Sequence, residues 1–337
     1  MSHSKIRLTV CFTLICWVAA AVPASAQHFA LVGGLLSRVA AGRSEVWGLR
    51  FPGGLIYRFN PSINGFAPVA GSLSQIAVGG GSLLQPDQVW GVNGAGVFSF
   101  DLSTNAYTQH NPPGATTYFS QVAVGEGDLD RCHPYEVWGL AWSNSTWYGL
   151  PYRYNYCTGQ FVQIPLPSGS TTPFSNIAVA ARGSDVWALD TNAHIWHLTN
   201  TCICAASDWT QVFGGYDNDT LQQIAVGVND VWGRDGNGSI YRFSSYPYGL
   251  FELVKPENNA GSAMQIAAGG DGVWAIEGGP DSYNGLRFCP MCGDYDGILG
   301  SGIFVPVGSF WTQVAVGSGA GVWVINSSNQ VFTWVRP

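Results

Sequence analysis

Three pairs of oppositely charged residues recur in this chain in the same order. An acid lies two residues before a tryptophan and an arginine follows one predicted strand later, giving Glu45 with Arg58, Glu136 with Arg153, and Asp230 with Arg242. Carboxylates and guanidinium groups bind sugar hydroxyls by charge-assisted hydrogen bonds. They equally well pair with each other across neighbouring strands. The sequence leaves both interpretations open.

Aromatic residues in the predicted loops are a second group of candidates. Sugars stack on aromatic faces while a few polar groups fix their orientation. The alternative is that these rings only pack their own loops. The candidates for carbohydrate binding are Trp142, Trp147, Tyr148, Tyr216, Tyr246, Tyr248, Tyr283 and Tyr295.

Motifs for catalysis or metal binding are weak. The six histidines are scattered, and neither HExxH, GxSxG nor a Ser/His/Asp cluster occurs. The segment Asp235-Gly-Asn237-Gly-Ser239 has alternating oxygen ligands, but it falls at a predicted hairpin turn and lacks the distant Glu of a calcium loop. We therefore expect no enzyme, no catalytic residue, no metal and no cofactor.

The candidate residues belong to a sequence repeat that occurs seven times, so the fold of this repeat must position them. Each copy has a short run such as Ile76-Ala-Val-Gly, then a loop, then a Val-Trp pair. The tryptophans lie roughly 40–50 residues apart, a spacing typical of propeller blades. They are Trp47, Trp90, Trp138, Trp187, Trp232, Trp274 and Trp323. We expect them to be structural, each wedged against the adjacent blade.

Two further apolar-aromatic runs follow the tryptophan in each unit, for example Ile56-Tyr-Arg-Phe59 and Phe66-Ala-Pro-Val69. β-Branched and aromatic residues between Gly, Asn and Pro clusters are strand signals. The fold class is therefore all-β, a seven-bladed β-propeller of four-stranded antiparallel blades, with residues 27–337 as one domain. The last copy ends without a fourth strand, and Phe29-Ala-Leu-Val matches that strand, so the N-terminal strand should complete the last blade and close the ring.

The pair Asn93-Gly94 predicts a two-residue hairpin turn in the second blade. This turn would place Trp90 opposite Val97. In the other copies the same pairing would place each acid opposite a basic residue, Glu45 with Arg58, Glu136 with Arg153, Asp185 with His197 and Asp230 with Arg242. The seventh copy lacks the acid, with Gly321 facing Thr333, and the sixth copy should break the pattern, with Gly272 facing Arg287.

The first residues of the chain predict a signal peptide. Lys5 and Arg7 are followed by an apolar stretch and by Ala24-Ser25-Ala26, a pattern typical of a signal peptide over residues 1–26. We therefore expect a secreted or periplasmic protein.

Six cysteines remain beyond the signal peptide, and an even count in an exported chain favours disulfides. A zinc site with four thiolate ligands could be built from two cysteine pairs, Cys202 with Cys204 and Cys289 with Cys292. We reject it because these pairs would lie in blades four and six, which do not touch. The candidates are Cys132, Cys157, Cys202, Cys204, Cys289 and Cys292, of which the first two should share one end of the third blade.

Charge and length exclude some partners. The net charge of −7 argues against nucleic acid and anionic membranes, which need basic patches. No apolar run after the signal peptide is long enough to span a bilayer.

The repeated phrase, with its third strand of the form Ile-Tyr-Arg-Phe, resembles the tectonin repeat of tachylectin-1-like and fish-egg-type lectins, over nearly the whole mature chain. This resemblance implies a β-propeller that binds glycans at sites repeated between blades. We therefore expect a secreted, non-enzymatic lectin for cell-surface or microbial glycans. The alternatives are a propeller that docks a protein partner on one face, and a polysaccharide hydrolase or lyase with carboxylates at the central channel.

Overall fold

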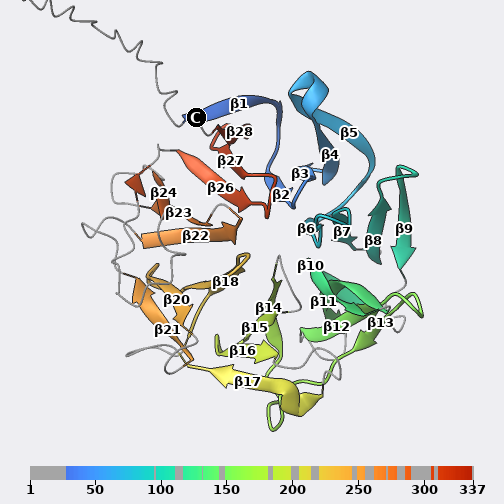
Figure 1. Ribbon diagram of the computed structural model, residues 1–337, viewed down its shortest axis with the longest axis vertical. Helices are drawn as coiled ribbons and strands as arrows, with labels where there is room; N and C mark the ends of the chain where they lie inside the picture. The colour runs from blue at the N-terminus through green and yellow to red at the C-terminus, as the bar shows by residue number, and fades with distance from the viewer. Residues whose placement is uncertain are drawn as a thin grey trace, which may run out of the picture.

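The structure is a closed ring of seven four-stranded antiparallel blades (Figure 1). The computed structural model describes residues 28–94, 96–110, 117–130, 132–143, 149–180, 185–198, 205–213, 220–244, 249–254, 262–270, 272–278, 285–289, 305–306 and 310–335. The predicted signal peptide lies outside these ranges. In the part of the chain that the structure describes, the helices are two short 3-10 turns, η1 (Pro61–Ile63) and η2 (Ala206–Asp208), and none could cross a membrane.

Each repeat forms one blade of four strands in sequence order from the inside of the ring outward. Blade one is β2 (Arg38–Ala41), β3 (Val46–Arg50), β4 (Leu55–Asn60) and β5 (Gly65–Ser72). Blade two is β6 (Gln75–Gly79), β7 (Gln88–Asn93), β8 (Gly96–Asp101) and β9 (Ala106–His110). Blade three is β10 (Thr117–Asp130), β11 (His133–Ser143), β12 (Leu150–Asn155) and β13 (Gln160–Gln163). Blade four is β14 (Phe174–Val179), β15 (Val186–Asp190), β16 (Ile195–Leu198) and β17 (Trp209–Val212).

The remaining blades follow the same plan. Blade five is β18 (Gln223–Val226), β19 (Val231–Arg234), β20 (Ile240–Ser244) and β21 (Leu250–Val254). Blade six is β22 (Ser262–Gly269), β23 (Gly272–Gly278), β24 (Gly285–Cys289) and β25 (Val305–Pro306). Blade seven is β26 (Trp311–Val316), β27 (Val322–Asn326), β28 (Gln330–Val335) and the N-terminal strand β1 (His28–Leu35).

The ring closes where the sequence predicts. Strand β1 pairs antiparallel with β28, so the first strand of the chain completes the last blade. The outer strands β1 and β5 also meet in parallel at Gly33 and Gly65, where the Gly33 N–H donates to the Asn64 carbonyl at 3.0 Å. A Cβ at Gly65 would lie 3.2 Å from the Gly33 oxygen, so glycine permits this approach. Blades seven and one are thereby joined into one eight-stranded sheet.

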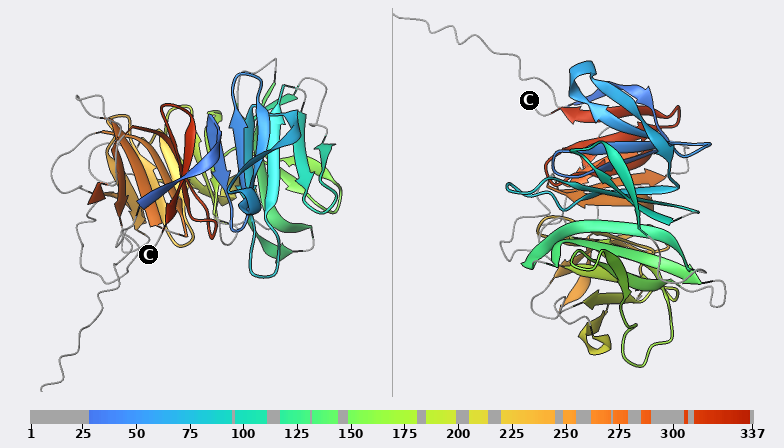
Figure 2. Two further views of the ribbon diagram at one scale, coloured as in Figure 1. Left: turned by 90° about the horizontal axis from the view of Figure 1, so that it is seen from above. Right: turned by 90° about the vertical axis from the view of Figure 1, so that its right-hand side faces the viewer.

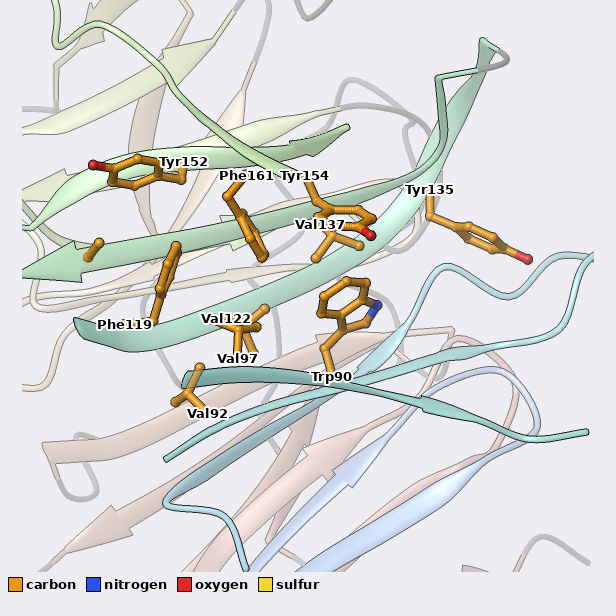
Figure 3. Packing of buried hydrophobic residues seen from close by; sticks show 11 residues of the cluster. Trp90, Val92, Val97, Phe119, Val122, Tyr135, Val137, Tyr152, Tyr154 and Phe161 are labelled. Carbon is orange, nitrogen blue, oxygen red and sulfur yellow. The ribbon is translucent and has the colours of Figure 1, made fainter. Parts of the chain in front are cut away.

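The repeated tryptophans form the contact between successive blades. All seven are at most 4% exposed. Trp47 of blade one meets Phe100 of blade two edge-on at 4.7 Å, and Trp323 of blade seven meets Phe59 of blade one at 4.8 Å. Figure 3 shows Trp90 between blades two and three, close to Tyr154, with which it makes an edge-on contact at 4.8 Å. Burial of these rings is the main cohesive term between blades.

A second inter-blade device was not recognised in the sequence. Glutamine precedes the first-strand run in five blades, and its amide forms two hydrogen bonds with the backbone of the next blade. Gln121, for example, donates to the Ile177 carbonyl at 2.9 Å and accepts from the Ile177 N–H at 3.2 Å. The other four are Gln75, Gln223, Gln265 and Gln313, which bind Val122, Ile266, Val314 and Val39. The last of these joins blade seven to blade one, so side-chain amides act as extra rungs across the inner strands.

The predicted hairpin register is wrong by two residues. In blade two, pairing continues to Asn93 opposite Gly96, and Trp90 lies opposite Ser99 rather than Val97. The turn therefore falls one residue later than the Asn-Gly signal indicates. A shift of two residues keeps each side chain on its face of the sheet, so the charged residues still meet, but diagonally. Arg58 accordingly lies opposite Trp47, with Glu45 beside it.

Blade three has the longest hairpin, visible in the side views of Figure 2. The Cys132–Cys157 disulfide ties this hairpin to the turn after β12, as predicted. Cys289 is also disulfide-bonded, whereas Cys202, Cys204 and Cys292 lie outside the described residues.

Candidate functional site at the mouth of the ring

The acidic residue before each tryptophan is used inside its own blade in three repeats. Glu45 accepts from the Trp47 indole N–H at 3.0 Å and from Arg58 Nε at 2.8 Å. Glu136 repeats this arrangement with Trp138 and Arg153, and Asp185 does so with Trp187 and His197. The basic group lies over the tryptophan ring, for example Arg58 over Trp47 at 5.7 Å. These carboxylates therefore have their hydrogen bonds satisfied without a ligand.

Blade five departs from this arrangement. Among the described residues, neither Trp232 Nε1 nor Arg242 Nε has an acceptor, although both atoms are buried and Arg242 still lies over the Trp232 ring at 5.7 Å. The carboxylate of Asp230 occupies the space above Gly227 instead, because a Cβ on Gly227 would lie 2.2 Å from Asp230 Oδ1. Burial raises the pKa of Asp230, and the nearby Trp232 and Arg242 oppose that rise only in part.

Asp230 lines a cavity of about 600 Å³, which we call the mouth cavity. Its walls come from six blades, at the end of the ring where first and second strands are joined. The charged lining residues are Arg43, Glu126 and Asp230, and the polar ones include Ser82, Gln85, Asn229 and Ser318. Gly269, Gly270 and Gly272 form the wall on the blade-six side. This lining can donate and accept many hydrogen bonds but holds few charges.

Two leucines stand on the rim of the mouth cavity. Leu83 is 82% and Leu84 is 94% exposed. Their loop is held in shape because Ser82 accepts from the Leu84 and Gln85 N–H groups through its hydroxyl, each at 3.2 Å. Leu83 and Leu84 therefore form an ordered apolar edge beside the polar lining of the mouth cavity.

Asp87 fixes the wall that carries Arg43, and the sequence analysis missed it. The carboxylate is 1% exposed and accepts from the backbone N–H groups of Arg43, Ser44 and Glu45 at 2.7–2.9 Å, and of Gly81 at 3.1 Å. It therefore clamps the loop of blade one onto that of blade two. The available signal was an acid three residues before the repeat tryptophan Trp90. The sequence pattern alone does not reveal the hydrogen-bond partners of Asp87.

Few of the predicted sugar-binding aromatics can be placed. Trp142 donates to the Ser120 hydroxyl at 2.6 Å and lies opposite Tyr118, at the end of blade three away from the hairpin tip. It therefore does not meet the residues of the mouth cavity. The remaining candidates, Trp147, Tyr148, Tyr216, Tyr246, Tyr248, Tyr283 and Tyr295, lie outside the described residues.

Asp235, considered for calcium, is part of a turn. Its carboxylate accepts from the N–H groups of Asn237 at 2.9 Å and Ser239 at 2.8 Å, and from the Tyr241 hydroxyl at 3.1 Å. These bonds are those of a side-chain-capped hairpin.

Blade six also differs from the prediction. Arg287 lies opposite Ala275 rather than Gly272, and Phe288 takes the place opposite Trp274, stacked at 4.5 Å. The one-residue shift turns Arg287 to the other face of the sheet, where it forms an ion pair with Glu277. Burial raises the pKa of Glu277 to about 7, and the attraction of Arg287 offsets this rise only in part.

This raised pKa predicts a pH-dependent stability. A carboxyl whose folded-state pKa exceeds its ordinary 4.5 favours the protonated form, so its contribution is complete below about pH 4.5 and is lost as pH rises through about 7. We expect Glu277→Gln to gain melting temperature relative to wild type between pH 5 and pH 8, by a few degrees. Scanning calorimetry across this range measures it, and a constant difference between the two proteins would contradict it.

Comparison with known proteins agrees with the architecture. Residues 19–172 match the family model of the tectonin domain. Among solved structures, YCF48 from Cyanidioschyzon merolae has a TM-score of 0.61 at 12% identity, covering 91% of this chain and 98% of that one. Human WBSCR16 has a TM-score of 0.55 at 12% identity, with 90% and 87% covered. At such identities the likeness shows the fold alone.

No functionally curated protein matches the chain. The family model, by contrast, falls on the repeats that build the first blades of the ring. The chain is thus a seven-bladed β-propeller whose residues 19–172 match the model of the tectonin domain.

Proposed function

We propose that the protein is a secreted, non-enzymatic lectin that binds a glycan in the mouth cavity. The observation that carries the proposal is Asp230: its carboxylate lines the cavity, while Glu45, Glu136 and Asp185 are held by their own blades. Trp232 and Arg242 lie near Asp230, but the Trp232 Nε1 and Arg242 Nε atoms make no hydrogen bond with it, so this acceptor, beside further polar groups, suits a ligand rich in hydroxyls.

The rim supports the same ligand class. A sugar presents an apolar C–H surface as well as its hydroxyls, and Leu83 and Leu84 offer an apolar surface next to the polar lining. The family association with carbohydrate binding points the same way.

The test is a glycan array with the mature protein, followed by titration of a bound glycan against Asp230→Ala. We expect affinity to fall about tenfold or more, because a hydrogen bond to a charged group contributes about 1.5–3 kcal/mol. Glu45→Gln is the matched control, since Glu45 holds the same repeat position but bonds Trp47 and Arg58. Unchanged affinity in Asp230→Ala would remove the mouth cavity as the site.

Two other outcomes would favour the alternatives. The exposure of Leu83 and Leu84 also suits an apolar protein partner, and silence across a broad array would favour that function. Glu126 and Asp230 share the cavity, so turnover of a polysaccharide that is lost in Glu126→Gln would instead establish a hydrolase or lyase.

A further inference from the structure

One residue of blade five breaks a rule that the other six blades obey. The residue two positions after the repeat tryptophan is apolar, at most 1% exposed, and packed between its own blade and the next. These residues are Leu49, Val92, Leu140, Leu189, Ile276 and Ile325. In blade five the position is Arg234, which is partly exposed and absent from the buried cluster between blades five and six.

The guanidinium of Arg234 has little compensation. Its Nη1 donates to the Asp235 backbone carbonyl at 3.0 Å, while its Nε is buried without an acceptor. Within the described residues, the ion pairs involve other basic groups and leave Arg234 without a carboxylate. Burial lowers the pKa of Arg234, and Asp235 opposes this only in part.

The adjacent acid cannot turn toward Arg234. Asp235 is 4% exposed, and both of its carboxylate oxygens are engaged, by the turn N–H groups of Asn237 and Ser239 and by the Tyr241 hydroxyl. Turning it would open the hairpin between β19 and β20. The positive charge of Arg234 is therefore not paired with any carboxylate of the described residues, although the net charge of the chain is −7.

We infer that Arg234 is the centre of an anion site at the seam of blades five and six, which takes the carboxylate of an acidic sugar. A guanidinium binds a carboxylate by charge-assisted hydrogen bonds, and Arg234 is partly exposed and has no carboxylate partner within the described residues. The site differs from the mouth cavity, because Arg234 lies at the other end of β19 from Asp230. The choice of a sugar as the carrier rests on the proposed lectin function.

The first test follows the Arg234 side chain directly. In ¹⁵N-labelled protein, the Nε–Hε signal that disappears in Arg234→Leu is assigned to Arg234. Titration with sodium glucuronate is expected to shift this signal, whereas glucose leaves it in place. No shift with glucuronate overturns the site, whatever the protein does with glycans. An equal shift with inorganic phosphate overturns the carboxylate assignment.

The second test measures discrimination between two matched glycans, a hyaluronan oligosaccharide and its carboxyl-reduced form. Wild type is expected to bind the acidic form about 10- to 100-fold more tightly. Arg234→Leu should abolish this preference and melt at or above the wild-type temperature, because leucine suits this position in three other blades. Arg234→Lys should retain part of the preference.

The control for charge alone is Arg50→Leu, which removes one exposed positive charge from the corresponding strand of blade one. It should keep the full preference. A lower melting temperature of Arg234→Leu with its preference intact would show a purely structural arginine and overturn the inference. Silence of wild type toward both glycans and across the glycan array, with the glucuronate shift present, would instead remove the proposed lectin function and leave the anion site standing.

Discussion

Glu136→Ala is expected to lower the free energy of unfolding by about 3–5 kcal/mol, because it removes the carboxylate from a buried ion pair. The Arg153 side chain is 5% exposed and the Glu136 side chain 0%. The substitution also removes the acceptor of the Trp138 indole N–H, which is bonded at 2.6 Å. Denaturant titration with calorimetry measures the loss.

The chain supplies its own control for this prediction. Glu45 makes the same contacts in blade one, but the Arg58 side chain is 33% exposed and can be hydrated when the acid is removed. Glu45→Ala should therefore cost only about 1 kcal/mol. Removing both charges of the buried pair, in Glu136→Leu with Arg153→Met, should recover much of the loss. Equal costs for the two single variants would show that burial does not decide the strength of the pair.

Replacing Cys132 and Cys157 together by serine is expected to cost about 3–4 kcal/mol, from the lost constraint on the unfolded chain. The bond closes a loop over a sequence separation of 25 residues. Substitution is preferable to a reducing agent, since Cys289 is disulfide-bonded too and would be opened as well. The measurement is the denaturation midpoint of the double variant.

The same variant should affect the mouth cavity. The hairpin of β10 and β11 carries Glu126 into the lining, and the disulfide ties its tip to the turn after β12. We expect hydrogen exchange near Glu126 to be faster in the double variant than in wild type, while exchange in the β14–β15 hairpin of blade four stays the same in both proteins. If stability and exchange both match wild type, the bond has no mechanical role in holding this wall.

Much of the architecture could be predicted because it is repeated. Alternating apolar and aromatic residues specify strands locally, and seven copies of the phrase specify blades. The likeness of the N-terminal segment to a fourth strand was enough to place β1 beside β28. The exact hairpin register could not be predicted from the repeat. Asn93-Gly94 marks where a turn is favourable, but packing decides where the turn falls.

The residues of the candidate site could be predicted from the sequence only in part. Glu45, Glu136 and Asp230 occupy the same place in the repeat and were given the same role, yet only Asp230 lines the cavity. Asp87 was overlooked although it fixes the neighbouring wall. The Gln121 amide was likewise overlooked because its partner, Ile177, belongs to the next blade.

What the amino-acid order settled by itself is the all-β class, the seven blades and the closure of the ring, because these follow from periodicity and from matching copies. The tertiary structure alone decided which of the repeat acids lines the mouth cavity, that Glu277 pairs with Arg287, and that Arg234 has no carboxylate partner among the residues described. The reason is physical. A strand needs only its own pattern, whereas the state of a charged side chain depends on burial and on groups that folding brings to it from distant parts of the chain.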